Sequence, residues 1–229
     1  MQPLGPKLAE GRDSEIFEHG PGLVQRRARD GRSLVGEAEV MRCALTRGFP
    51  CPEVNDAGDG WLVMERLTGP TMLGAAQRRP WNLKRYGRML ASLHEQLHAI
   101  AAPPGLPNAP MAGDRLLHGD LHPDNIILTE RGPMVIDWAN AARGDPAYDL
   151  ADTWVVLSSA NAPGSRLDRL LTAVGRRALL RGFLGQVDFP AAVRGLPAAA
   201  EHRSRDPNMT EAEKARMRTL AARASARSA

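Results

Sequence analysis

The sequence that decides the fold is HGDLHPDNIILTERGPMVIDW, which occupies residues 118–138. A polar, acidic loop leads into a short apolar run, then a turn over residues 129–133, then a second apolar run that ends at Asp137. This pattern predicts a β-hairpin. Asn125 directly precedes the first strand and Asp137 directly follows the second. If the hairpin is symmetric about Arg131, these two residues face each other with Cβ atoms roughly 4.5–5.5 Å apart, beside Asp120.

Amide and carboxylate oxygens gathered at one point suit a hard cation such as Mg²⁺, which favours a phosphate as co-ligand. The residues therefore indicate phosphoryl transfer, with Asp120 accepting the proton of an attacking hydroxyl and Asn125 and Asp137 holding the metal. The alternative is an Asp-rich turn that caps its own backbone. A calcium loop is excluded, because the sixth position from Asp120 is Asn125 rather than Gly and the twelfth is Arg131 rather than Glu.

The composition is that of one or two globular domains, with 229 residues of which 43% are hydrophobic and 24% charged. Lys+Arg number 30 and Asp+Glu 26, a balance that gives no support to nucleic acid as a partner. Two cysteines, Cys43 and Cys51, are too few for a disulfide framework and indicate reduced thiols. We find no signal segment and no apolar run long enough to span a membrane, so we expect a cytoplasmic protein without a membrane partner.

The order of elements predicts an α+β fold with two parts. Residues 1–67 favour a small sheet, with strands at 23–27 and 61–65 and one helix over 34–46. Thr68-Gly69-Pro70 is the natural boundary, and residues 68–229 favour a mainly helical part that contains the acidic loop, 118–125, and the hairpin, 125–138. Apolar residues at helical spacing predict a helix over about 86–100. Further helices are expected from Asp145-Pro146, over 165–184, and over 191–229.

Three segments together resemble the aminoglycoside phosphotransferase family, which includes choline kinase-type enzymes and has a protein-kinase-like fold. They are HGDLHPDN (118–125), IDW (136–138) and GDPAYDLA (144–151). The resemblance implies an antiparallel-sheet N-terminal lobe with one helix, a helical C-terminal lobe, and a nucleotide bound between them. It implies that Asp120 is the catalytic base and that Asn125 and Asp137 are metal ligands. Asp149 would brace the catalytic loop through backbone amides. Apart from the resemblance, we expect His118 to pack beneath that loop as a core residue.

The resemblance extends less sharply to the first 67 residues. Gly11-Arg12-Asp13-Ser14 falls where the family has its phosphate-covering loop, although a plain hairpin turn explains it equally well. Arg26 aligns with the strand cation that contacts phosphates and Glu37 with its helix partner, while Arg27 would point to the opposite face of the strand. Backbone groups of Glu65 and Leu67 would contact the adenine.

A competing motif lies in the helix predicted over 86–100. His94-Glu95-Gln96-Leu97-His98 matches H-E-x-x-H, the pattern of two zinc ligands and a glutamate base. A third ligand is needed, and His118 and Asp120 are the candidates. The alternative function is therefore a zinc-dependent hydrolase. The apolar stripe on the same helix instead indicates that the two histidines pack beside it and bind no metal.

The sequence thus predicts an ATP- or GTP-dependent phosphotransferase that uses Mg²⁺ and acts on a hydroxyl of a small molecule resembling an aminoglycoside, a sugar or an amino alcohol. A catalytically silent nucleotide-binding module of the same fold is a further alternative. The residues identify neither the acceptor nor the oligomeric state, and they assign no role to His122.

Overall fold

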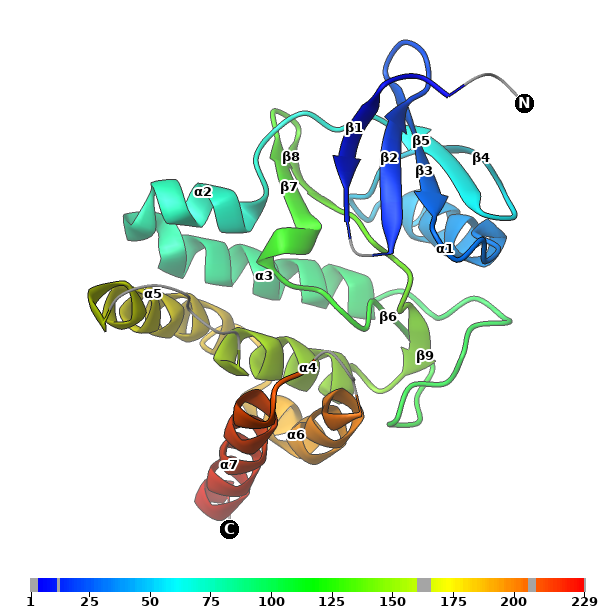
Figure 1. The fold of residues 1–229 in the computed structure, drawn as a ribbon. Coiled ribbons are helices and arrows are strands. Elements are labelled where there is room, and N and C mark those ends of the chain that lie inside the picture. The colour runs from blue at the N-terminus through cyan, green and yellow to red at the C-terminus, as the bar shows by residue number, and fades with distance from the viewer. Residues whose placement is uncertain (1–3, 12, 160–165, 206–208, 229) are drawn as a thin grey trace. The chain divides into compact units, whose positions relative to one another are not determined.

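The structure is a computed structural model that describes residues 4–11, 13–159, 166–205 and 209–228. The chain divides into two compact units (Figure 1). The first comprises Met1–Pro70 and Ile127–Ala139, and the second comprises Thr71–Ile126 and Asn140–Ala229. The predicted lobes, 1–67 and 68–229, differ from these units in one main respect: the hairpin, expected in the second lobe, lies mostly in the first unit.

The first unit is built on a five-stranded antiparallel sheet with strand order β1-β2-β3-β5-β4. The strands predicted at 23–27 and 61–65 are confirmed as β3 and β5. Gly60 has a φ of 78° in the turn between β4 and β5, a conformation that a residue with a side chain rarely adopts. The strands are Lys7–Glu10 (β1), Ser14–Glu18 (β2), Leu23–Ala28 (β3), Val54–Gly58 (β4) and Trp61–Glu65 (β5).

One helix, α1 (Val35–Thr46), connects β3 to β4 and confirms the helix predicted over 34–46. Ala38, Met41 and Ala44 recur at helical spacing and are buried, so this face packs into the core of the unit. Glu37 is also buried, although it is charged. A buried carboxylate needs partners, and its partners belong to the candidate site.

The predicted hairpin is present as β7 (Ile126–Thr129) and β8 (Gly132–Val135). Its turn consists of Glu130 and Arg131, within the predicted span of 129–133. Thr129 closes the turn, because its Oγ1 donates to the Gly132 carbonyl at 2.9 Å and accepts from the Arg131 amide at 3.2 Å. After β8 the chain returns to the core of the first unit, where the rings of Trp138 and Phe49 meet edge to face.

The second unit is mainly helical, and it also holds the antiparallel pair β6 (Arg115–Leu117) and β9 (Ala142–Gly144). The apolar stripe predicted over 86–100 is confirmed on helix α3 (Leu83–His98), since Tyr86, Leu90, Leu93 and Leu97 are all buried. The helix predicted over 165–184 is also confirmed, as α5. The helices are Met72–Arg78 (α2), Leu83–His98 (α3), Pro146–Ser159 (α4), Arg166–Leu184 (α5), Phe189–Ser204 (α6) and Glu211–Ser228 (α7), with short 3₁₀ turns at Pro80–Asn82 (η1) and Pro123–Asn125 (η2).

Two glycines allow these helices to approach each other at backbone distance. A Cβ on Gly87 of α3 would lie 2.1 Å from the Leu179 carbonyl oxygen of α5. A Cβ on Gly195 of α6 would lie 2.1 Å from the Ala147 carbonyl oxygen of α4. Side chains at either position would push the helices apart, so the close approach of α4 and α6 requires glycine at position 195.

The segment predicted to be helical over 191–229 forms two helices, α6 and α7. A capping box starts the second. The Thr210 side chain accepts from the Glu213 amide at 3.3 Å, and Glu213 Oε2 accepts from the Thr210 amide at 2.9 Å. This reciprocal pair satisfies amides that a helix start leaves without intrahelical partners.

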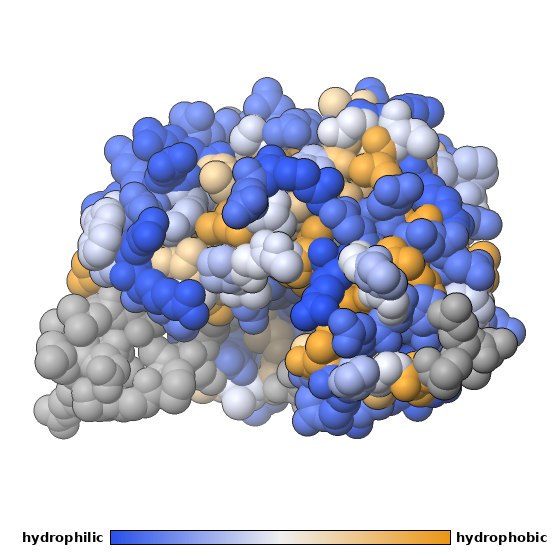
Figure 2. Space-filling view, turned by 90° about the horizontal axis from the view of Figure 1, so that it is seen from above, coloured by the Kyte–Doolittle hydropathy of each residue, from blue (hydrophilic) through white to orange (hydrophobic). Residues whose placement is uncertain are grey.

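Hydrophilic residues cover most of the face drawn in Figure 2, with hydrophobic residues in scattered patches among them. Within the described ranges, none of the helices combines the length and the apolar character needed to cross a bilayer.

Candidate active site

The acidic loop, residues 118–125, connects β6 to β7 in the second unit and is fixed at several points. Leu121 is fully buried, and its carbonyl oxygen accepts from Thr153 Oγ1 of α4 at 2.7 Å. Gly119 has a φ of 73°, and a Cβ there would lie 2.4 Å from the Asn140 carbonyl oxygen. The loop therefore requires glycine at 119, which fixes the direction in which Asp120 leaves the backbone.

Asp149 of α4 lies beneath the start of this loop and is fully buried. Its Oδ1 accepts from the Gly119 amide at 2.9 Å and its Oδ2 from the His118 amide at 3.2 Å. Burial alone would raise the pKa of Asp149, but its contacts with His94 and His98 hold that pKa well below its usual range. Asp149 is thus an ionised anchor for the loop, and its support of catalysis stays a prediction. His118, expected to pack beneath the loop, is buried.

Asp120 is partly buried and lies among hydrogen-bond donors. Arg203 Nη2 donates to its Oδ1 at 2.5 Å, while its Oδ2 lies 3.4 Å from Asn125 Nδ2 and 3.5 Å from His122 Nε2. Burial raises the pKa of Asp120, but the hydrogen bond from His122 and the charge of Arg203 outweigh it and hold that pKa below its usual range. Asp120 is therefore ionised at neutral pH, and its Oδ2 is held less tightly than its Oδ1.

Asn125 and His122 complete the loop. Asn125 Nδ2 donates to the Asp120 carbonyl oxygen at 2.9 Å, which leaves the amide oxygen of Asn125 as its potential metal ligand. His122, which the sequence does not assign, caps the turn η2, because its Nδ1 accepts from the Asp124 amide at 3.2 Å. In the neutral ring the proton is then on Nε2, the atom nearest to Asp120.

Two residues of this cluster are missed by the sequence analysis. Arg203 of α6 donates from Nε to Asp152 Oδ1 at 2.7 Å and from Nη2 to Asp152 Oδ2 at 2.6 Å, in addition to its bond to Asp120. Asp152 lies on α4 with 1% of its surface exposed. Although burial disfavours its charge, Arg203 has a pKa raised above the usual value by the two carboxylates. The only sequence signal is the position of Asp152 shortly after the GDPAYD segment; nothing local marks Arg203.

The first unit holds the second half of the predicted residue set. Arg26 forms a buried, two-pronged ion pair with Glu37, at 2.5 Å and 3.0 Å, and its Nη1 lies 3.5 Å from Asp137 Oδ1. Glu37 also accepts from the Trp138 amide at 3.2 Å. Asp137 has a φ of 65°, the single positive φ outside glycine in the described part of the chain, and its side chain is half exposed. Such strained conformations cluster at functional sites.

The other predicted nucleotide contacts lie in the same unit. Ser14 begins β2, and its carbonyl oxygen accepts from the Gly11 amide at 2.8 Å, as in a hairpin turn; Arg12 lies outside the described residues. The Glu65 amide donates to the Glu53 carbonyl oxygen at 2.8 Å, so an adenine contact at Glu65 would use its carbonyl. The Glu65 side chain pairs with Arg131 of the hairpin turn. Leu67 follows β5 and is half-buried.

The structure brings together Arg26, Glu37 and Asp137 in the first unit. In the second unit it brings together Asp120 and Asn125, with Asp149 behind them. The predicted meeting of Asn125 and Asp137 joins residues of different units and stays a prediction.

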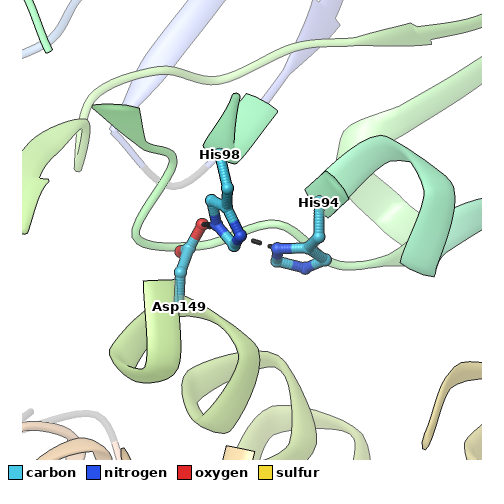
Figure 3. Close-up of side chains that lie close together, drawn as sticks. All are labelled: His94, His98 and Asp149. Atoms are coloured by element: carbon cyan, nitrogen blue, oxygen red, sulfur yellow. Dashed lines mark hydrogen bonds and ion pairs between the residues drawn. The ribbon is translucent and has the colours of Figure 1, made fainter. Parts of the chain in front are cut away.

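The His94–His98 pair does not form the predicted zinc hydrolase site. Its third neighbour is Asp149, rather than His118 or Asp120, and the candidate ligand atoms lie within 4.8 Å of one another (Figure 3). His94 and Asp149 are fully buried, whereas Glu95, the expected base, is exposed. A catalytic zinc needs an open position for water or substrate and a base beside it. This cluster provides neither.

A family model and a curated relative each match part of the chain. The model of the phosphotransferase enzyme family (APH) matches residues 106–185. The thiamine kinase of Salmonella paratyphi B is 37% identical over 100 residues, which are 41% of this chain and 31% of that relative. The matched region thus spans about a third of the curated relative.

Solved structures extend the similarity to the fold of nearly the whole chain. The choline/ethanolamine kinase family protein from Mesorhizobium loti has a TM-score of 0.59 at 18% identity. The aligned region covers 98% of this chain and 87% of that protein. The ADP-bound aminoglycoside phosphotransferase APH(2'')-Ib has a TM-score of 0.56 at 16% identity, and the aligned region covers 88% of this chain and 82% of that protein. The predicted resemblance is therefore confirmed at the level of fold and local match: the chain has the protein-kinase-like fold, and residues 106–185 match the model of the phosphotransferase enzyme family.

Proposed function

We propose that this protein transfers the γ-phosphoryl group of ATP or GTP to a hydroxyl of a small molecule. The observation that carries the proposal is the environment of Asp120, an ionised carboxylate on a loop anchored by Asp149 within the segment that matches the phosphotransferase family. Relatives and structural neighbours are named as kinases of thiamine and of choline or ethanolamine, and as aminoglycoside phosphotransferases. We therefore propose an acceptor that resembles an aminoglycoside, a sugar or an amino alcohol.

Asp120 is the proposed catalytic base. Its Oδ1 is held by Arg203 at 2.5 Å, so Oδ2, whose nearest donors are 3.4 Å and 3.5 Å away, is the oxygen left to accept the hydroxyl proton. A carboxylate with a lowered pKa is a weak base. That suits phosphoryl transfer through a loose transition state, because positioning and charge stabilisation supply most of the catalysis.

Asn125 and Asp137 are the proposed ligands of Mg²⁺. Their donor set fits this ion: one amide oxygen, whose nitrogen is committed to the Asp120 carbonyl, and one half-exposed carboxylate. When bound, Mg²⁺ would neutralise charge on the nucleotide phosphates.

Arg26 is the proposed phosphate contact, positioned by Glu37. Its Nε is buried and has no hydrogen-bond partner among the described residues, so it can still donate to an anionic group. Arg27, the alternative, is half-buried on the opposite face of β3. Ser14 and the backbone of Glu65 and Leu67 are the remaining proposed nucleotide contacts.

The test is an ADP- or GDP-release assay over a panel of thiamine, choline, ethanolamine, sugars and aminoglycosides, with mass analysis of the product. The wild-type protein should phosphorylate at least one class. Asp120→Asn should abolish transfer while retaining nucleotide binding, because it removes the base without removing a proposed metal ligand. Asp124→Asn is the matched control, since Asp124 is exposed on the same loop. Full turnover by Asp120→Asn would refute the assignment of the base. Nucleotide binding without turnover on any acceptor would favour a silent module.

A further inference from the structure

The His94–His98–Asp149 cluster is a feature that the proposed phosphotransferase does not use as a catalytic site. The two imidazoles come from the last turns of α3 and the carboxylate from α4, and the three groups turn toward one another (Figure 3). The side chains of His94 and Asp149 are fully buried, and that of His98 is 10% exposed. Three potential metal ligands therefore converge in a closed space.

The hydrogen bonds around Thr153 determine which nitrogen of His94 carries a proton. Thr153 Oγ1 lies 2.7 Å from the Leu121 carbonyl oxygen, which can only accept, so the hydroxyl proton points there. Thr153 Oγ1 is then the acceptor for His94 Nε2, at 2.9 Å. A neutral imidazole has a single N–H, which leaves His94 Nδ1 as a bare lone pair.

That lone pair is buried and lacks a hydrogen-bond partner among the described residues. It lies 3.5 Å from Asp149 Oδ2, another electron-rich atom. A second proton on Nδ1 would make a poor hydrogen bond across 3.5 Å. Two ligands of one tetrahedral zinc ion with bonds of about 2.0–2.1 Å are separated by roughly 3.3 Å. The separation therefore fits a shared metal ion better than a shared proton.

We propose that His94 Nδ1, His98 Nε2 and Asp149 Oδ2 bind a divalent transition-metal ion, with Zn²⁺ as the best match. Imidazole nitrogens favour zinc over Mg²⁺, and the His₂-carboxylate set is a common zinc combination. His98 Nε2 lies 2.9 Å from Asp149 Oδ2, and the three ligand atoms lie within 4.8 Å of one another, so the side chains would have to shift to close around the ion.

The surrounding contacts are those of a supported metal site. The other ring nitrogen of His94, Nε2, donates to Thr153 Oγ1, and Asp149 accepts from the amides of His118 and Gly119. Partners of this kind orient metal ligands. Because Asp149 also anchors the catalytic loop, the ion would tie α3, α4 and that loop together. The site is separate from the proposed Mg²⁺ ligands and does not depend on the proposed function.

The test is metal binding by the full chain. After dialysis against a chelator, the protein should take up one equivalent of Zn²⁺ per chain, measured by mass spectrometry, and its thermal midpoint should rise. A large excess of Mg²⁺ should not displace the zinc. His98→Gln should weaken zinc binding more than about 100-fold, because it removes a direct ligand, and His19→Gln, a histidine of the first unit, should leave the affinity unchanged.

A measurement on the wild-type protein keeps the proposal testable if the variant fails to fold. X-ray absorption of the zinc-loaded chain should show nitrogen and oxygen ligands with two imidazoles. Sulfur ligands from Cys43 or Cys51, uptake well below one equivalent at micromolar zinc, or full affinity in folded His98→Gln would each overturn the proposal.

Discussion

Arg203 should stabilise the second unit more than any surface ion pair. It donates three charge-assisted hydrogen bonds of 2.5–2.7 Å to Asp120 and Asp152, and Asp152 is 1% exposed. Removing one partner of a buried ion pair typically costs about 3–5 kcal/mol, because the other charge is left without compensation. Arg203→Met keeps helix propensity and side-chain length, so it should lower the free energy of unfolding by about 3 kcal/mol. That corresponds to roughly 6–12 °C in melting temperature for a chain of this size.

The assay is urea unfolding at pH 7, carried out as a double-mutant cycle. In an Asp152→Asn background the buried partner is neutral and needs no counter-charge. Arg203→Met should therefore cost at least about 1.5 kcal/mol less there than in the wild-type background. An equal cost in both backgrounds, or a loss below about 1 kcal/mol for the single variant, would refute the reasoning.

Three further predictions concern separate parts of the chain. Gly87→Ala should destabilise the fold by about 3 kcal/mol in urea unfolding, because the new methyl group meets a backbone oxygen of α5. Gly36→Ala is the control, since position 36 on α1 faces open space, and it should stabilise the fold by up to about 1 kcal/mol. Burial raises the pKa of the Cys51 thiol to about 12, so only about one molecule in 10⁴ carries a thiolate there at pH 8. Iodoacetamide should therefore modify the half-buried Cys43 before Cys51, as followed by mass spectrometry. Equal rates at the two cysteines would contradict this. Asp137→Asn should weaken nucleotide binding more than 10-fold in the presence of Mg²⁺ and little in its absence, measured by calorimetry; equal losses would argue against a metal ligand.

The parts of the fold that the sequence predicts correctly are those that local patterns determine. The hairpin follows from two apolar runs around a Gly-Pro-containing turn, and α3 follows from apolar residues at helical spacing. Asp149 is found because its spacing from the loop belongs to a recognisable motif. The boundary between α6 and α7 was also readable in principle, since Thr210-Glu-Ala-Glu213 is a capping box.

The remaining contacts depend on how helices pack, which local sequence does not encode. Arg203 reaches Asp152, 51 residues earlier, because α6 approaches α4 at Gly195. The third member of the histidine cluster is Asp149 for a similar reason, since its position relative to α3 is set by the packing of α4. The strained backbone of Asp137 has no sequence signature beyond the tolerance of aspartate for positive φ.

The account depends on one metal ion held by residues at the two ends of the hairpin. A crystal structure with Mn²⁺ and a non-hydrolysable nucleotide, with anomalous data to locate the manganese, tests it most directly. We predict a manganese ion bound by the Asn125 amide oxygen and the Asp137 carboxylate, with Asp120 Oδ2 near the γ-phosphate but not bound to the metal. Manganese held by other residues, or a nucleotide whose phosphates contact neither Asn125 nor Asp137 through the metal, would contradict the account.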